Sequence, residues 1–419
     1  MRNCKIYTLS NGIRVVHQYD TSTEMVHCGI LLEIGSRDET QKNQGIAHFW
    51  EHMAFKGTKK RRAFHVNNLL ESIGGELNAY TEKEKVVFYA SVRKNYVERA
   101  VDVISDITFN SVFPEKEIEK ERGVILEEMA MYLDDPDDSI QDEFESVIFE
   151  DHPMGMNILG TTNTVSSFRR RDFTSFIRKH IDTRRIVFSC VGNVSEDKLE
   201  TLVKGYFEKI PLRKSRIRRR KFAGYRPKEV LLHRPVTQAK CAIGRDAFPI
   251  KHKNRIPFFM LVHLLGGSGM NSRLNLTLRE KHGYVYSVDA NYTPFSDTGL
   301  FAIYFGTEKH QLKKCMALIQ KEMARLADKQ LGTRQLSGLK EQIKGQLAMG
   351  EESKLGMMLA FGRSVLDFGK VPPLAEIYER VDQVDASILR DLAGKMFNTK
   401  KMSYLIMEPN GLLVNGSNQ

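Results

Sequence analysis

The chain has 419 residues, which is more than one typical domain holds and suits two domains of about 200 residues each. Its composition, 41% hydrophobic and 27% charged with only 12 prolines, excludes wholesale disorder and is typical of a globular protein. The net charge of +11 is partly local, because seven of the ten residues 213–222 are Lys or Arg, and we interpret that run as a solvated linker rather than a functional basic patch.

Several other classes of protein are also disfavoured. The five cysteines are widely spaced and form no CxxC pair, which argues against a disulfide framework or a cysteine zinc site. The start of the chain has no apolar signal segment, and no run approaches the roughly 18 apolar residues of a spanning helix. No known nucleic-acid-binding module is recognisable. We therefore expect a cytoplasmic protein with neither membrane nor nucleic acid as a partner.

The first half of the chain alternates strand and helix patterns. Residues 5–19 contain an Asn-Gly turn between β-rich runs, which predicts a hairpin. Further strands are expected at 26–36, 76–93 and 185–194. Helices are expected at 45–55, 63–75, 97–110, 114–133 and 195–211, the fourth entered through Pro114 and the last with Ser195 as its N-cap.

The second half repeats this order weakly. Strands are expected at 229–248, 283–307 and 402–409, and helices at 255–267, where glycines end the pattern, and 310–328. The repetition predicts an α+β fold with two similar domains, each a mainly antiparallel sheet flanked by helices. We place the domains at 1–210 and 228–419, joined by a basic linker at 211–227.

The clearest chemical signal is HFWEH at residues 48–52. On a helix, His48 and His52 lie four apart on one face, so both imidazoles can reach one zinc ion, with Glu51 beside them as a base. A catalytic zinc site needs a third protein ligand, and the helix at 114–133 offers Glu121, Glu127 and Glu128, among which spacing does not choose. Two ordinary histidines on a soluble helix remain an alternative at this point.

Four stretches together resemble one known family. HFWEH is similar to the HxxEH signature of the inverted zincins. The surroundings at 45–58, 74–92, 121–129 and 264–288 resemble pitrilysin/insulinase-type zinc metallopeptidases, in particular the short-chain branch that includes the mitochondrial processing peptidase and bacterial homologues. The resemblance covers nearly the whole chain and implies a zinc metalloendopeptidase.

The resemblance also implies a role for each matching residue of the metal site. It places one Zn²⁺ per chain on His48, His52 and Glu128, with Glu51 as the general base and proton donor and Glu121 as the group that orients a ligating histidine.

Substrate contacts are implied at two further places. Asn78, Ala79 and Thr81 would bind the peptide through strand addition, and Arg279 with Tyr286 would hold its backbone and the developing oxyanion. Tyr284 competes for the role of Tyr286. Glycines 266, 267 and 269 fit no phosphate-binding motif and more simply end a helix or form a loop facing the substrate.

The resemblance further implies a homodimer that encloses a chamber, with oligopeptides or unstructured polypeptides as substrates. Processing of one specific leader or precursor is an alternative activity. A non-catalytic scaffold subunit of the same fold is a second alternative, which the complete set of HxxEH and Glu128 disfavours.

Overall fold

The computed structural model describes residues 4–215 and 217–409, which form two compact units. Unit 1 contains residues 1–129, 156–220 and 347–373, and unit 2 contains 130–155, 221–346 and 374–419. The predicted domains are continuous, whereas each unit includes one segment from the opposite half of the chain. This exchange has no signal in the sequence, because the pattern of an apolar helix does not indicate which sheet the helix covers.

Unit 1 is built on a six-stranded sheet. Its strand order is β1-β2-β6-β3-β5-β4, and every neighbouring pair is antiparallel except the parallel pair β2 and β6. Strand β4 forms one edge of the sheet. The bounds are β1 Lys5–Thr8, β2 Arg14–Tyr19, β3 Met25–Leu32, β4 Glu76–Thr81, β5 Val86–Arg93 and β6 Ile186–Gly192.

Unit 2 repeats this design on a five-stranded sheet. Its order is β7-β11-β8-β10-β9, with β7 and β11 parallel and the other pairs antiparallel. The bounds are β7 Glu229–Arg234, β8 Ala239–Ala247, β9 Val285–Pro294, β10 Gly299–Thr307 and β11 Ser403–Pro409. Two similar, mainly antiparallel sheets flanked by helices confirm the predicted α+β fold.

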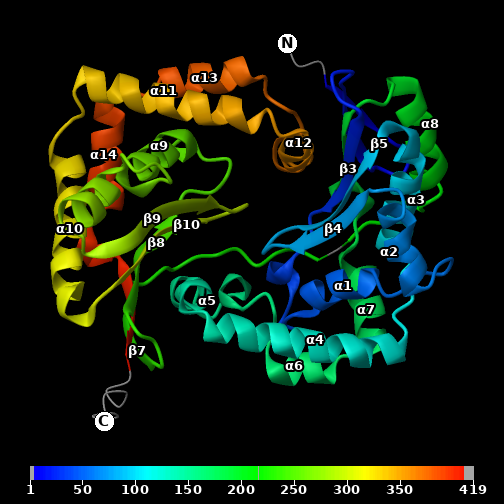
Figure 1. Ribbon diagram of the computed structural model, residues 1–419, viewed down its shortest axis with the longest axis horizontal. Coiled ribbons are helices and arrows are strands. Elements are labelled where there is room, and N and C mark those ends of the chain that lie inside the picture. The colour runs from blue at the N-terminus through cyan, green and yellow to red at the C-terminus, as the bar shows by residue number, and fades with distance from the viewer. Residues whose placement is uncertain (1–3, 216, 410–419) are drawn as a thin grey trace, which may run out of the picture. The chain divides into compact units, whose positions relative to one another are not determined.

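Helices cover both sheets (Figure 1). Those that belong wholly or mainly to unit 1 are α1 Ile46–Ala54, α2 Ala63–Glu71, α3 Val97–Phe109, α4 Glu115–Asp134, α6 Thr162–Ser167, α7 Arg170–His180, α8 Glu196–Phe207 and α12 Lys354–Phe368. Those of unit 2 are α5 Pro136–Ile148, α9 Arg255–Gly266, α10 Leu312–Asp328, α11 Thr333–Gly350, α13 Leu374–Asp382 and α14 Ala386–Met396. The predicted helices around 45–55, 63–75, 97–110, 114–133, 195–211, 255–267 and 310–328 are all present.

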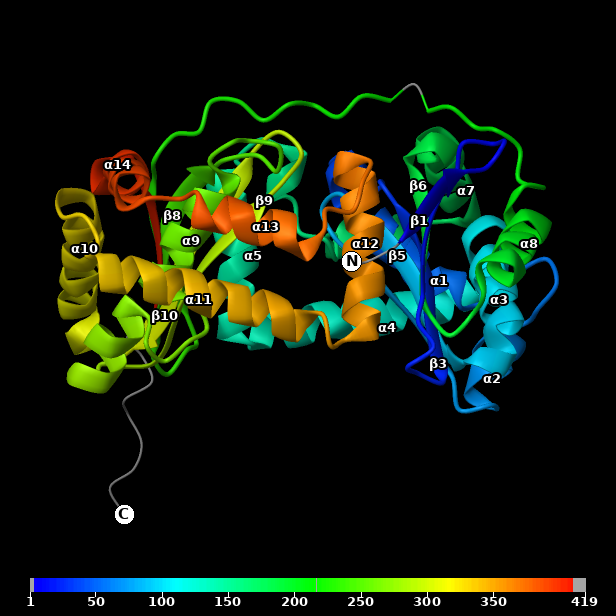
Figure 2. The same ribbon diagram turned by 90° about the horizontal axis from the view of Figure 1, so that it is seen from above.

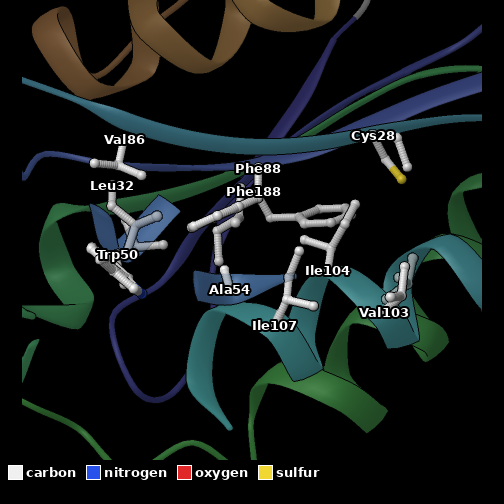
Figure 3. Close-up of a cluster of buried hydrophobic side chains, with 14 of the residues drawn as sticks. Cys28, Leu32, Trp50, Ala54, Val86, Phe88, Val103, Ile104, Ile107 and Phe188 are labelled. Carbon is white, nitrogen blue, oxygen red and sulfur yellow. The ribbon is translucent and has the colours of Figure 1, made fainter. Parts of the chain in front are cut away.

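The core of unit 1 lies between one face of its sheet and helices that include α1, α2 and α3. Figure 3 shows Trp50 of α1 beside Leu32 and Val86, with Phe88 and Phe188 farther along the sheet. All five side chains are fully buried. Burial of one face of α1 in this core leaves its opposite face, which carries His48, Glu51 and His52, free for chemistry.

The other face of the same sheet is covered by α12, which comes from the C-terminal half of the chain (Figure 2). Its Met358, Phe361 and Val365 pack on Leu31 and Val187 in a second buried cluster. A side chain at Gly362 would overlap Leu31, since an added Cβ would lie 2.3 Å from the Leu31 Cδ1 atom. The corresponding segment of unit 2 is α5, whose Phe144 packs against Tyr304 of β10.

Part of the basic run proves to be fixed rather than solvated. Arg219 donates from Nε and Nη2 to the two carboxylate oxygens of Asp38, both at 2.9 Å, and from Nη2 to the backbone carbonyl of Glu84 at 2.9 Å. Its side chain is only 10% exposed and that of Asp38 5%. The interpretation of the run as solvated is therefore wrong for Arg219, whose guanidinium is the cationic partner of a buried carboxylate. Arg216 lies outside the described residues.

Candidate active site

The helix that carries HFWEH is held at its first turn by a buried carboxylate. Glu39 accepts hydrogen bonds from the backbone amides of Gly45 and Ala47, both at 2.8 Å, and so satisfies two donors that the start of α1 leaves open. Gly45 has φ +91°, a conformation that favours glycine. Burial raises the pKa of Glu39 to about 8, although the two amides act in the opposite direction. Glu39 was not among the residues predicted from the sequence, where its only signal is that it is an acidic residue shortly before a helix start.

The two histidines and Glu128 come together on the open side of α1. The Nε2 atoms of His48 and His52 lie 3.2 Å apart, and the Glu128 carboxylate oxygens lie 3.7 Å from His48 Nε2 and 3.5 Å from His52 Nε2. The three ligand atoms all fall within 4.8 Å of one another, and no other such group exists among residues 4–215 and 217–409. Glu127, the neighbouring candidate on α4, is exposed and lies outside this group.

A neighbouring carboxylate orients one imidazole. Glu121 lies with Oε1 3.0 Å from His52 Nδ1 and with Oε2 2.6 Å from Lys56 Nζ. An ionised carboxylate only accepts, so His52 Nδ1 carries the proton and its Nε2 presents a lone pair toward His48 and Glu128. Lys56 is a second site residue that the sequence analysis did not single out.

The donor set fits a zinc ion. Two imidazole nitrogens and a carboxylate converge here, and each of them can offer a lone pair to a single cation, which is the donor set that zinc prefers. Burial lowers the pKa of His48 to about 3, which favours the neutral imidazole that binds metal. Burial also lowers the pKa of His52, but the Glu121 hydrogen bond and the charges of Glu128 and Glu51 outweigh it and raise that pKa. The carboxylates that attract a proton to His52 attract a dication in the same way.

Glu51 lies on the same face of α1 and is fixed from the edge strand. Its Oε2 accepts a hydrogen bond of 2.6 Å from the Thr81 hydroxyl, at the end of β4. Burial raises the pKa of Glu51 and the charge of Glu128 adds to that shift, while Thr81 opposes it. The predicted base and the predicted substrate strand are therefore in direct contact.

The remaining residues of the predicted strand are available for pairing. Among the described strands, β4 pairs only with β5, so its other edge is open. The side chain of Asn78 is exposed, and its oxygen accepts from the Ala79 amide at 2.8 Å. An extended peptide can add to such an edge through main-chain hydrogen bonds.

The second predicted pair belongs to unit 2. The Arg279 guanidinium lies 5.9 Å from the centroid of the Tyr286 ring, and Tyr286 is 86% exposed on β9. Tyr284 instead stacks on His282 with centroids 5.1 Å apart, and its carbonyl accepts from Thr307. The structure thus brings Arg279 and Tyr286 together, while their role toward a substrate stays a prediction.

Comparisons with known proteins agree with this geometry. Residues 14–162 match the insulinase family (peptidase family M16), and residues 167–343 match the M16 inactive domain. A protein from Rickettsia felis named "Uncharacterized zinc protease" is 33% identical over 98% of both chains. The subunit beta of the mitochondrial-processing peptidase of Bos taurus is 31% identical over 97% of this chain and 84% of its own. A protease of Helicobacter pylori has the same fold, with a TM-score of 0.89 and 20% identity over 98% of this chain and 100% of its own.

A transmembrane segment is not found in the part of the chain that the structure describes, since no helix there is both long and apolar enough to cross a bilayer.

Proposed function

This chain belongs to the insulinase family of peptidases, family M16, and from that premise we propose that it is a zinc-dependent endopeptidase acting on oligopeptides or unstructured polypeptides. The family resemblance predicted from HFWEH and its neighbouring stretches is thereby confirmed. The observation that carries the proposal is the convergence of His48, His52 and Glu128 beside Glu51.

Each residue of the site has a chemical task in this proposal. His48, His52 and Glu128 hold the metal, and Glu121 keeps the His52 ring in the tautomer that binds it. When bound, zinc supplies Lewis acidity, which lowers the pKa of a water molecule to about 7 and polarises a carbonyl.

Glu51 accepts the proton of the attacking water and later gives it to the leaving amine. Thr81 holds the Glu51 carboxylate in place, and strand β4 positions the peptide bond by pairing with the substrate main chain. Arg279 and Tyr286 donate to the substrate carbonyl, and each well-placed donor of this kind is worth about 3–4 kcal/mol in the transition state.

The critical experiment compares metal content with peptide hydrolysis. We expect wild-type protein to bind zinc and to cleave a quenched oligopeptide, and Glu51→Gln to keep its zinc but to lose activity by about 10²–10⁴-fold. Full activity in Glu51→Gln, or a purified protein that takes up no zinc when metal is supplied, would refute the peptidase.

The neighbouring glutamates of α4 provide a matched pair for the ligand assignment. Glu128→Gln should lower the metal content, whereas Glu127→Gln should not, because Glu127 lies outside the ligand group. Equal metal loss in both variants would contradict the proposed ligands.

Two finer features rest on the family resemblance alone. We propose that two chains form a homodimer around an enclosed chamber, which light scattering of the purified protein tests directly. Removal of a specific leader remains a second candidate activity, favoured by the 31% identity with the processing peptidase subunit. A substrate profile restricted to one precursor would support it over general degradation.

A further inference from the structure

Unit 1 contains a cavity of about 570 Å³ that shares no lining residue with the metal site. It lies at the C-terminal ends of α3 and α7, beside the loop between α1 and α2 and the first residues of the basic run. All of its lining residues belong to unit 1. Small-molecule sites have volumes of about 300–1,000 Å³, so this cavity can hold a small organic molecule.

The charge of the lining is positive and comes from three segments that lie far apart in the chain. Lys59 follows α1, Arg178 belongs to α7, and Arg213 and Lys214 begin the basic run, whereas no Asp or Glu lines the cavity. All four residues are exposed, and none of them has an ion pair within the described ranges 4–215 and 217–409. An anion in the cavity therefore meets four cations and no competing carboxylate.

Two buried carboxylates of the same segments are neutralised elsewhere. Asp106 Oδ2 lies 2.6 Å from Arg61 Nη1, and Asp182 Oδ2 lies 2.6 Å from Arg184 Nη2. Neither carboxylate lines the cavity. The four cations of the lining are thus left over after the local ion pairs have formed.

Backbone hydrogen bonds hold the cationic residues in place. The Thr183 amide donates to the Arg213 carbonyl at 3.1 Å, and the Arg213 amide donates to the Thr183 hydroxyl at 3.2 Å. The Lys59 amide donates to the carbonyl of Asn110, just after α3, at 3.0 Å. These segments are therefore fixed before a ligand binds, so binding does not have to order them.

The rest of the lining is apolar or carries only hydroxyl groups. The apolar side chains are those of Phe109, Phe113, Ile177 and Ile181, and the hydroxyls are those of Thr108, Ser111 and Thr174. Each hydroxyl donates its proton to the carbonyl four residues earlier in its own segment. No Asn, Gln, Asp, Glu or His lines the cavity, and these are the side chains that most often recognise the edge of a base or sugar. The lining therefore favours a hydrocarbon group over a nucleobase.

The apolar surface of the cavity is recessed. Phe113 is only 2% exposed and Ile181 only 1%. None of the exposed large hydrophobic residues found in the described part of the chain lines the cavity. Proteins that bind a bilayer surface usually present such side chains for insertion. The cavity thus suits a single molecule that enters it rather than a membrane.

We propose that this cavity binds a small amphipathic phosphate ester, whose phosphate pairs with Arg178, Arg213 and Lys59 and whose hydrocarbon chain lies on Phe109 and Ile177. Phosphate carries up to two negative charges, and a guanidinium binds it through two parallel hydrogen bonds, so it matches a site with two arginines better than a single carboxylate does. The inference goes beyond the peptidase, since the site needs neither zinc nor Glu51.

Isothermal titration calorimetry of the full chain in a phosphate-free buffer measures this binding directly. Octyl phosphate is compared with inorganic phosphate, which lacks the chain, and with octyl glucoside, which lacks the charge, all below the concentrations at which micelles form. We expect octyl phosphate to bind about 100-fold more tightly than inorganic phosphate, because burial of about three or four methylene groups suffices for that gain.

Octyl phosphate should also bind about 10–100-fold more tightly than octyl glucoside, as expected for hydrogen bonds to a charged group. Equal affinities for octyl phosphate and inorganic phosphate would indicate an adventitious ion only and would overturn the proposal. Equal affinities for octyl phosphate and octyl glucoside would overturn it as well, since the cations would then have no part in binding.

Matched variants locate the binding site. Arg178→Gln with Arg213→Gln should weaken the binding of octyl phosphate about 10–100-fold. Arg171→Gln with Arg218→Gln removes the same charge from the same helix and the same basic run, but outside the cavity, and should change the affinity less than about twofold. Thr174→Trp places a bulky ring into the cavity from an exposed position of α7 and should abolish binding. Equal weakening in the two double variants would overturn the assignment, because net charge alone would then explain it.

Two further measurements separate this ligand from a lipid surface and from the peptidase. Vesicles that contain an anionic phospholipid should not sediment the protein at physiological salt, and sedimentation without any binding of free octyl phosphate would overturn the proposal in favour of a membrane. Glu51→Gln and zinc-free protein should bind octyl phosphate as tightly as wild type. A chain that cleaves no peptide can therefore still show this site, and an active peptidase can lack it.

Discussion

Replacement of Arg219 by methionine should destabilise unit 1 by about 3–5 kcal/mol, because it leaves the buried Asp38 carboxylate without its cation. Both side chains are at least 90% buried, so solvent screening reduces this figure little. The Glu84 carboxylate also lies near Arg219, but it keeps Arg37 as a second cationic partner, with Arg37 Nη1 2.6 Å from Glu84 Oε1. The loss therefore falls mainly on Asp38.

The chain offers a built-in reporter for this measurement. Its single tryptophan, Trp50, is fully buried in the core of unit 1, so its fluorescence during urea unfolding follows that unit. In a thermal melt of a unit of about 220 residues, each kcal/mol lost from the free energy of unfolding lowers Tm by roughly 2–4 °C. Arg218→Met removes an exposed charge of the same run and should change stability by less than about 0.5 kcal/mol.

The pH dependence provides the sharper test. Burial opposes the ionised form of Asp38, yet the hydrogen bond and charge of Arg219 lower its pKa below the ordinary value near 3.9. A lowered folded-state pKa stabilises the fold above pH 4 or so, and this contribution is lost as the pH falls through that pKa. Without Arg219, burial alone raises the pKa of Asp38, so the stability gap between wild type and Arg219→Met should narrow as the pH falls toward 4 and below it, with both proteins compared free of zinc.

Two results would refute this reasoning. One is an Arg219→Met variant no less stable than Arg218→Met. The other is a double variant, Arg219→Met with Asp38→Asn, that regains none of the lost stability, since the buried charge would then not be the cause.

Three further outcomes follow from the site and the core. Glu39→Ala should cost unit 1 about 2–3 kcal/mol by the same fluorescence assay, because two buried amides lose their hydrogen-bond acceptor. Glu121→Gln should weaken zinc binding about 10–100-fold in a competition with a chromogenic chelator, and unchanged affinity would mean that His52 needs no partner. Burial raises the pKa of the Cys28 thiol to about 12, so native protein at pH 8 should react with a thiol reagent only at the half-buried Cys4, and labelling of Cys28 before unfolding would contradict the described core.

The sequence predicted most of unit 1 because its signals are local. The Asn-Gly turn gave the β1–β2 hairpin, and the four-residue spacing of His48 and His52 gave the shared face of α1. The choice of Glu128 needed the family resemblance, since spacing on the helix did not distinguish it from Glu121 or Glu127. Lys56 and Glu39 were not predicted, because a single charged residue forms no spacing pattern with other residues that would distinguish it in the sequence.

The non-local features had no comparable signal. Arg219 is one of seven basic residues in its run, and only the position of Asp38 in space distinguishes it from the others. The sequence of α12 is apolar without a clear one-sided pattern, so its place on the sheet of unit 1 depends on partners more than 150 residues earlier in the chain. Tertiary context decides both cases.

The exchange of α5 and α12 between the halves has a consequence for how the protein is made. When the first 220 residues have left the ribosome, every strand of the first sheet has been synthesised. Helix α12, which covers Val16, Leu31 and Val187, has not. Completion of unit 1 must wait for residue 368 or so, and the apolar face stays open to chaperones or to another nascent chain until then. A gene split at the linker should therefore yield two fragments that are insoluble apart and recover only when produced together.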